Sequence, residues 1–195
     1  MGRIFRELID VCNGFFVTGT DTNVGKTYFS AIILSYTRGL YYKPIQTGDK
    51  DSEAVKGFTK LGEAHFSKEA YYFKEPVSPH ILFEKYGVAV DIEKISTPNS
   101  PKFKIVAEGA GGIYTPIKKD YFMIDLMVKF GFPVIVVTID KLGCINHTIL
   151  TVQEIRRMGL NPLFVVLNKF NSKSYNLKSI KDILKTPVMA VPEFK

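Results

Sequence analysis

Short apolar runs rich in valine, isoleucine and phenylalanine alternate with helical stretches along this chain. The sequence predicts strands at residues 14–19, 40–45, 103–109, 133–140, 162–170 and 188–191, and helices at 26–37, 122–131 and 145–159. Strands that are apolar at almost every position are buried on both faces, which is typical of a mostly parallel sheet. We therefore expect an α/β fold, with a mostly parallel central sheet and helices on both faces, as a single domain over residues 1–195.

Glycine-rich and polar segments follow several of these strands. The segments are GTDTNVGKT, KPIQTG, EGAGG, DKLGCINH and NKF. In open parallel sheets, ligands bind beyond the carboxyl ends of the strands. The sequence therefore predicts one functional site along that edge of the sheet.

The segment between the first strand and the first helix has the features of a phosphate-binding loop. It ends in Gly25-Lys26-Thr27, although Gly19 lies one position earlier than the usual G-x-x-x-x-G-K-[ST] spacing requires. A loop that leaves a buried strand and opens a helix presents free backbone N–H groups to phosphate. Lys26 would reach the β- and γ-phosphates, and Thr27 would supply an oxygen to Mg²⁺. These features indicate a P-loop NTPase-like fold.

A carboxylate is placed where Mg²⁺ would need one. Glu108 follows the apolar run of residues 103–107 and precedes glycines that permit close backbone approach. A buried carboxylate needs a partner, and Mg²⁺ is a natural one. Glu53 in DKDSEAV is a second candidate ligand, and Asp51 competes with it because spacing alone does not choose between them.

Composition argues against several other functions. The chain has 26 basic and 19 acidic residues and a net charge of +7. Its lysines are scattered along the sequence, which contains no arginine-rich run and no zinc-finger motif. We expect no nucleic-acid partner. Its apolar runs are too short to cross a bilayer, so no membrane partner is expected either. Two cysteines, Cys12 and Cys144, give neither a disulfide framework nor a metal spacing, and a cytoplasmic location is expected.

Five segments together resemble one enzyme family. VTGTDTNVGKT, YKPIQTG, EPVSPHI, EGAGGIYTPI and KLGCINHTILT are similar, in this order, to the motifs of dethiobiotin synthetases, the ATP-dependent enzymes of biotin synthesis. The resemblance extends over residues 14–192. It also accounts for the spacing of the loop, because the family carries the extra residue as G-T-D-T-x-V-G-K-T. The family often has glutamate where this chain has Asn23.

The resemblance implies a reaction and its partners. It implies a homodimer that converts 7,8-diaminopelargonate, CO₂ or bicarbonate and ATP into dethiobiotin, ADP and phosphate, with Mg²⁺ as cofactor. The steps are formation of a carbamate, its phosphorylation by ATP, and ring closure by the second amine. Several negative charges then meet beside the γ-phosphate, and two lysines with Mg²⁺ would stabilise them.

The resemblance also implies site residues. The catalytic set is Lys43, Lys26 and Thr22. The ATP-binding set is Asn23, Val24, Gly25, Lys26, Thr27, Tyr28, Glu108, Asn168, Pro192 and Glu193, with Asn168 directed at adenine. The metal set is Thr27, Glu53 and Glu108. The substrate set is Thr47, Lys43, Gly143, Cys144, Ile145 and Asn146, with the start of the helix after Gly143 near the dimer interface and suited to the substrate carboxylate.

An alternative is a regulatory ATPase of the kind that partitions DNA or positions the division machinery. Those proteins carry a lysine soon after the first glycine of the loop. This chain has Thr20-Asp21-Thr22 there, and no lysine. The sequence therefore favours the biosynthetic enzyme over the regulatory ATPase.

Overall fold

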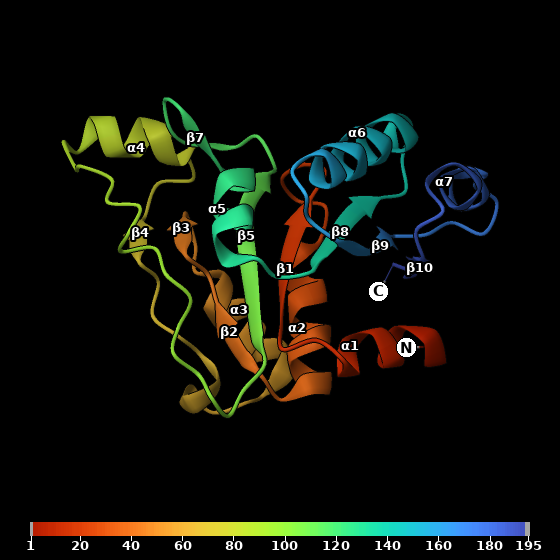
Figure 1. Cartoon of the computed structure of the whole chain (residues 1–195), viewed down its shortest axis with the longest axis horizontal. Helices are drawn as coiled ribbons and strands as arrows, with labels where there is room; N and C mark the ends of the chain where they lie inside the picture. Colours follow the sequence, from red (N-terminus) through yellow and green to blue (C-terminus); the bar gives the residue numbers. More distant parts are fainter. Residues whose placement is uncertain (1, 194–195) are drawn as a thin grey trace.

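A six-stranded sheet forms the centre of the computed structural model, which describes residues 2–193 (Figure 1). Its strand order is β10-β9-β8-β1-β5-β2, and all neighbouring strands are parallel. The strands are β1 (Gly14–Gly19), β2 (Leu40–Tyr42), β5 (Ile105–Gly112), β8 (Val134–Ile139), β9 (Pro162–Asn168) and β10 (Val188–Ala190). The order changes direction at β1, which lies between β5 and β8. The predicted α/β fold is confirmed, and β1 is at the position where such sheets bind ligands.

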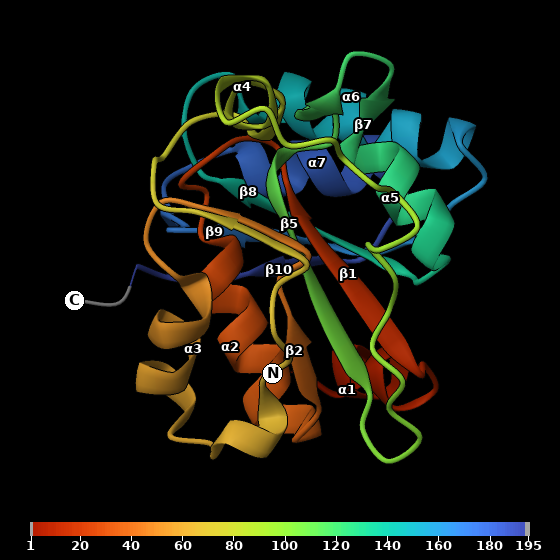
Figure 2. The same ribbon diagram turned by 90° about the vertical axis from the view of Figure 1, so that its left-hand side faces the viewer.

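Helices cover both faces of the sheet (Figure 2). One layer contains α1 (Arg3–Asp10), α2 (Lys26–Thr37) and α3 (Asp51–Thr59), and the other contains α5 (Met123–Phe130), α6 (Cys144–Arg157) and α7 (Asn176–Leu184). Two shorter helices, η1 (Glu63–His65) and α4 (Pro79–Lys85), lie between α3 and β5 in the sequence. Within residues 2–193, no helix combines the length and the apolar character that crossing a membrane requires.

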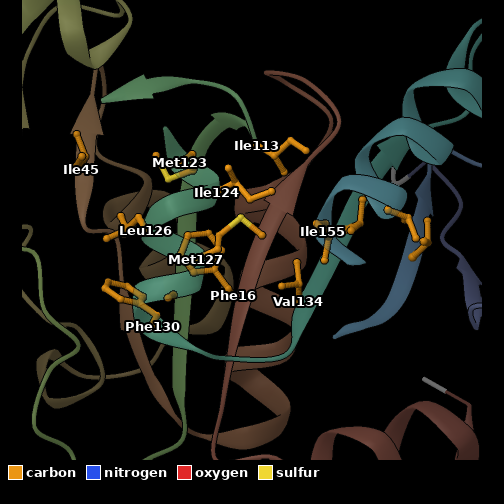
Figure 3. Packing of buried hydrophobic residues seen from close by; sticks show 14 of the residues in the cluster. Phe16, Ile45, Ile113, Met123, Ile124, Leu126, Met127, Phe130, Val134 and Ile155 are labelled. Atoms are coloured by element: carbon orange, nitrogen blue, oxygen red, sulfur yellow. The ribbon is translucent and has the colours of Figure 1, made fainter. Parts of the chain in front are cut away.

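Each face of the sheet has its own hydrophobic core. Phe16 and Val134 pack against α5 and α6, where Met127 and Ile155 meet them (Figure 3). On the opposite face, the neighbouring strand residues pack against α1 and α2. Because successive strand side chains point to opposite faces, two buried faces require apolar residues at almost every position. This requirement explains the continuous apolar runs of the sequence.

The strand predicted at residues 40–45 is two strands in the structure. β2 ends at Tyr42, and β3 (Ile45–Thr47) leaves the main sheet to pair in parallel with β4 (Tyr71–Phe73). Pro44 lies at the break, where its missing N–H cannot contribute to a ladder. A separate antiparallel pair joins β6 (Pro116–Lys118) to β7 (Tyr121–Phe122). The prediction of one continuous strand is wrong, and the break places Lys43 between two sheets.

Helix α1 was not expected from the sequence. The burial of one of its residues, Ile9, predicts that the helix contributes to the stability of the fold. Ile9 is 0% exposed in the core that contains Phe29 and Phe164, whereas Ile4 on the same helix is 62% exposed. We expect Ile9→Ala to lower the free energy of unfolding by about 2–4 kcal/mol, because it leaves a cavity. Ile4→Ala should change it by less than about 0.5 kcal/mol. Urea unfolding followed by circular dichroism measures both, and equal effects would contradict this role of α1.

Candidate functional site

The loop between β1 and α2 has the predicted geometry. Gly25 precedes the first residue of α2 with a φ of 102°, in the left-handed region that favours glycine. A Cβ atom at this position would collide with the side-chain amide of Asn168. The loop therefore turns tightly between a buried strand and a helix N-terminus, and its N–H groups suit an anion there.

Lys26 lies across this loop. Its side chain is 7% exposed, and Nζ donates a hydrogen bond to the backbone oxygen of Asp21 at 2.9 Å. Burial, together with the positive charge of Lys43, lowers the pKa of Lys26 to about 8, against the opposing effect of Glu108. Lys26 thus loses its proton far more readily than an ordinary lysine.

The low pKa of Lys26 predicts proton uptake when a nucleotide binds. A phosphate beside the ammonium favours its charged form and raises its pKa, so that above about pH 8 binding takes up a proton. At about pH 9 we expect ADP, in the presence of EDTA, to bind with uptake of about one proton, and with much less at about pH 7. Calorimetry in buffers of different ionisation enthalpy measures this uptake.

Lys26→Arg is the matched control for that measurement, because a guanidinium keeps its proton at both pH values. Lys26→Arg should bind ADP with no more proton uptake at about pH 9 than at about pH 7. Equal uptake by the original protein at both pH values would contradict the low pKa of Lys26.

Glu108 is the centre of the site. It is 0% exposed within β5, and its Oε1 accepts hydrogen bonds from Thr27 Oγ1 at 2.9 Å and from Lys43 Nζ at 3.2 Å. Its Oε2 accepts one from the hydroxyl of Tyr41 at 3.0 Å. Burial and the charge of Glu108 raise the pKa of Tyr41 well above its usual value, so the phenol remains a donor. A buried carboxylate is thus fully hydrogen-bonded, as its burial requires.

Lys43 is held by two carboxylates. It is 4% exposed, and Nζ lies 2.5 Å from Asp51 Oδ2 and 3.2 Å from Glu108 Oε1. Nζ also donates to the backbone oxygen of Gly109 at 3.0 Å. Burial alone would lower the pKa of Lys43, but Glu108 and Asp51 more than offset it, and its pKa is raised. Lys43 therefore keeps its proton above about pH 8, where Lys26 loses its own.

The structure distinguishes Asp51 from Glu53. Asp51 begins α3 and pairs with Lys43 at the site, whereas the Glu53 side chain is 65% exposed and pairs with Lys56 at 3.3 Å. Glu53 was the expected metal ligand, and its side chain lies away from the other ligands. The geometry favours Asp51, which the sequence had left as the alternative.

A cavity of about 1310 Å³ joins these groups. Of the residues expected from the sequence, it is lined by Thr22, Asn23, Gly25, Lys26, Thr27, Tyr28, Lys43, Thr47 and Glu108. Val24 is buried beneath the loop at 1% exposure. Residues that the sequence did not single out also line the cavity, including Gln46 and Ser78. The phosphate, metal and catalytic residues expected from the sequence therefore meet around one space, with Glu53 as the exception.

Two parts of the expected site lie outside this cavity. Gly143, Cys144, Ile145 and Asn146 do not line it, although the next turns of α6 do so through His147, Leu150, Thr151 and Glu154. Asn168 donates from Nδ2 to the backbone oxygen of Val24 at 2.9 Å, so it touches the loop from behind. Pro192 and Glu193 are exposed near the end of the chain, and Glu193 pairs with Lys169 at 2.7 Å.

The site offers the ligands that Mg²⁺ prefers. Thr27 supplies a hydroxyl, and Glu108 and Asp51 supply carboxylates on either side of Lys43. Hard oxygen donors with room for phosphate oxygens are typical of nucleotide-bound magnesium. Among residues 2–193, no group of three or more His, Cys, Asp or Glu side chains could hold a metal by itself. The residues present therefore suit a metal that is held together with a nucleotide.

The chain is similar in sequence to one protein family over most of its length. A family model described as an AAA domain matches residues 13–193. The chain is 41% identical to the ATP-dependent dethiobiotin synthetase BioD of Lawsonia intracellularis, over 79% of the chain and 75% of that protein. It is 38% identical to the protein of the same name from Fusobacterium nucleatum, over 87% of the chain and 85% of that protein.

Solved structures share the fold. The MinC:MinD cell division complex of Aquifex aeolicus matches with a TM-score of 0.58 and 15% identity, over 92% of this chain and 81% of that one. A ParA family ATPase from Chlorobium tepidum matches with a TM-score of 0.58 and 10% identity, over 94% and 86%. Identities this low show the shared P-loop fold alone.

Proposed function

Because this chain belongs to the family of ATP-dependent dethiobiotin synthetases, the carbon–nitrogen ligases of biotin biosynthesis, we propose that it joins 7,8-diaminopelargonate and CO₂ at the expense of ATP. The observation that best supports this proposal is the convergence of Lys26, Lys43 and Glu108 on one cavity next to the β1–α2 loop. That convergence suits a reaction in which negative charge accumulates beside a terminal phosphate.

The proposed reaction has three steps. One amine of diaminopelargonate attacks the carbon of CO₂ and loses a proton, which gives a carbamate. A carbamate oxygen attacks the γ-phosphorus of ATP, and ADP leaves. The second amine then attacks the carbon of the phosphorylated carbamate, loses a proton and expels phosphate, which closes the ureido ring of dethiobiotin.

Two lysines have different tasks in this proposal. Lys26 would leave the Asp21 carbonyl for the β- and γ-phosphates, whose charge raises its pKa from about 8 and keeps the ammonium protonated. Lys43 is already charged and faces the carbamate and the transferring phosphoryl group. Positive charge fixed in place before the reaction stabilises a loose phosphoryl-transfer transition state without further reorganisation. Thr22 and Thr47 line the same cavity and offer hydroxyls to phosphate and substrate.

Thr27, Asp51 and Glu108 would hold Mg²⁺. When bound, the ion neutralises charge on the β- and γ-phosphates. The protein's own contribution is to fix the three ligands: Thr27 and Glu108 are already hydrogen-bonded to each other, and Asp51 is held by Lys43. Asn168, with Pro192 and Glu193, is proposed to contact adenine and ribose from behind the loop.

The substrate tail is proposed to lie at an interface between two copies of the chain. The start of α6, from Gly143 to Asn146, is a helix N-terminus, which suits a carboxylate, but it does not line the cavity of its own chain. Leu142, beside this helix start, is 100% exposed, and Leu150 on the same helix is 58% exposed. We propose a homodimer that covers these leucines and in which the α6 start of one copy lies near the cavity of the other.

The proposal is tested by product formation. Purified protein with ATP, Mg²⁺, bicarbonate and diaminopelargonate should form dethiobiotin and ADP in equal amounts, as measured by mass spectrometry and a coupled ADP assay. Omitting diaminopelargonate should stop ADP formation. ATP hydrolysis that continues at the same rate without diaminopelargonate would instead support the regulatory ATPase alternative.

A further inference from the structure

Gln46 is a buried amide that no step of the proposed reaction uses. It lies in the middle of β3 and is 2% exposed. Its Nε2 donates hydrogen bonds to the backbone oxygens of Thr47 at 3.0 Å and Asp49 at 2.6 Å. Its Oε1 accepts one from the backbone N–H of Asp51 at 3.0 Å. The amide nitrogen and oxygen of Gln46 are thus bonded to the backbone of three residues between the end of β3 and the start of α3.

The bond to Asp51 anchors the start of α3. The first N–H groups of a helix have no partner within the helix and need one from elsewhere. The residue that precedes α3, Lys50, makes no side-chain capping bond. Gln46 supplies an acceptor to the first N–H of the helix, from five residues earlier in the chain. It therefore acts as a remote cap for α3.

The other two bonds of Gln46 fix the path of the connecting turn. Gly48 turns there with a φ of 79°, and its N–H donates to the backbone oxygen of Phe73 at 2.9 Å. A side chain at Gly48 would press against Pro76, which lies 3.1 Å from the position of its Cβ. The turn is thus tied to β4 on one side and to Gln46 on the other, and its exit direction sets where α3 begins.

We infer that Gln46 is a positioning residue, which holds the first residue of α3 so that the carboxylate of Asp51 reaches Lys43. The Asp51 Oδ2 atom lies 2.5 Å from Lys43 Nζ. A small displacement of the start of α3 would break this ion pair. This inference rests on the proposed roles of Asp51 and Lys43. The new element is that the neutral amide of Gln46, which need not contact any reactant, controls the relative position of Asp51 and Lys43.

Removal of the amide should have a selective effect. We expect Gln46→Ala to lower kcat by about tenfold, because small misplacements of catalytic groups cost rates of this order or more. The affinity for AMP-PNP in EDTA should stay within about twofold, since the hydrogen bonds that Gln46 makes within residues 2–193 go to Thr47, Asp49 and Asp51 and not to the β1–α2 loop. The gain in AMP-PNP affinity on adding Mg²⁺, measured by calorimetry, should shrink by about fivefold or more.

A double-mutant cycle tests whether Gln46 acts through Asp51. Gln46→Ala, Asp51→Asn and the double variant are compared for kcat and for the magnesium-dependent gain in AMP-PNP affinity. If the amide acts through the carboxylate, Gln46→Ala has no further effect when Asp51→Asn is present. Multiplied effects of the two changes would overturn the inference and would indicate that Gln46 contacts a reactant directly.

Two matched controls exclude general damage. Gln153→Ala removes the other glutamine, which is exposed on α6, and Glu53→Gln neutralises the exposed acid on α3. Both should retain activity within about twofold. If Asp51→Asn alone has no effect, the proposed role of Asp51 fails. If Asp51→Asn is impaired while Gln46→Ala is normal, the positioning role of Gln46 fails. Thermal unfolding of every variant identifies any that do not fold.

Discussion

Lys26→Ala should lower kcat/KM for dethiobiotin formation by about 10²- to 10³-fold, the size typical of losing one fixed charge or donor at a developing anion. The side chain is buried, borders the cavity beside Lys43, and donates a hydrogen bond to the Asp21 carbonyl at 2.9 Å. Without it, the β- and γ-phosphates lose their nearest cation on the loop. Both the affinity for ATP and the rate of phosphoryl transfer should fall.

The Lys26 prediction is measured by dethiobiotin formation and by AMP-PNP binding in EDTA. Lys26→Met fills more of the vacated space than alanine, and it should be equally inactive if charge rather than packing is responsible. Lys102→Ala is the control, because this exposed lysine precedes the opposite end of β5. Activity of Lys26→Ala within about tenfold of the original would remove Lys26 from the site.

Most of the fold could be predicted because both faces of the sheet are covered. β1 and α2 have the bounds that the sequence predicts, Gly14–Gly19 and Lys26–Thr37, since burial and the glycine at the loop end determine them locally. Helix α1 could not be predicted in this way. Its burial depends on Phe164, which follows it by more than a hundred residues, and no local pattern records that contact.

The site residues that belong to a sequence motif could be predicted, whereas those outside a motif could be predicted less well. Lys26, Thr27 and Glu108 follow from a loop and a strand, whose geometries are fixed. The choice between Asp51 and Glu53 depends on the residue at which α3 starts. Residues two apart on a helix point about 200° away from each other, so only one of the pair can face the cavity. Gln46 accepts a hydrogen bond from the first N–H of that helix, a contact that becomes visible only in three dimensions.

Lys43→Gln should lower kcat by about 10²-fold, and its signature should differ from that of Lys26→Ala. Lys43 makes no contact with the β1–α2 loop among its hydrogen bonds and ion pairs within residues 2–193, where its partners are Glu108, Gly109 and Asp51. AMP-PNP affinity in EDTA should therefore be reduced much less than by Lys26→Ala. Glutamine keeps much of the side-chain length and its hydrogen-bonding ability, so the charge is what the substitution removes.

The carboxylates make the Lys43 prediction more specific. With the ammonium gone, Asp51 and Glu108 face each other without the cation that lies 2.5 Å and 3.2 Å from their oxygens. Two like charges in a buried site bind a divalent cation more readily than a pair already neutralised by lysine. Calorimetry should therefore show an unchanged or larger gain in AMP-PNP affinity on adding Mg²⁺, while dethiobiotin formation is almost lost. If Lys43→Gln keeps its rate within about twofold, Lys43 is not catalytic. If it loses the magnesium-dependent gain as well, the lysine supports the metal ligands and does not act on the reactants.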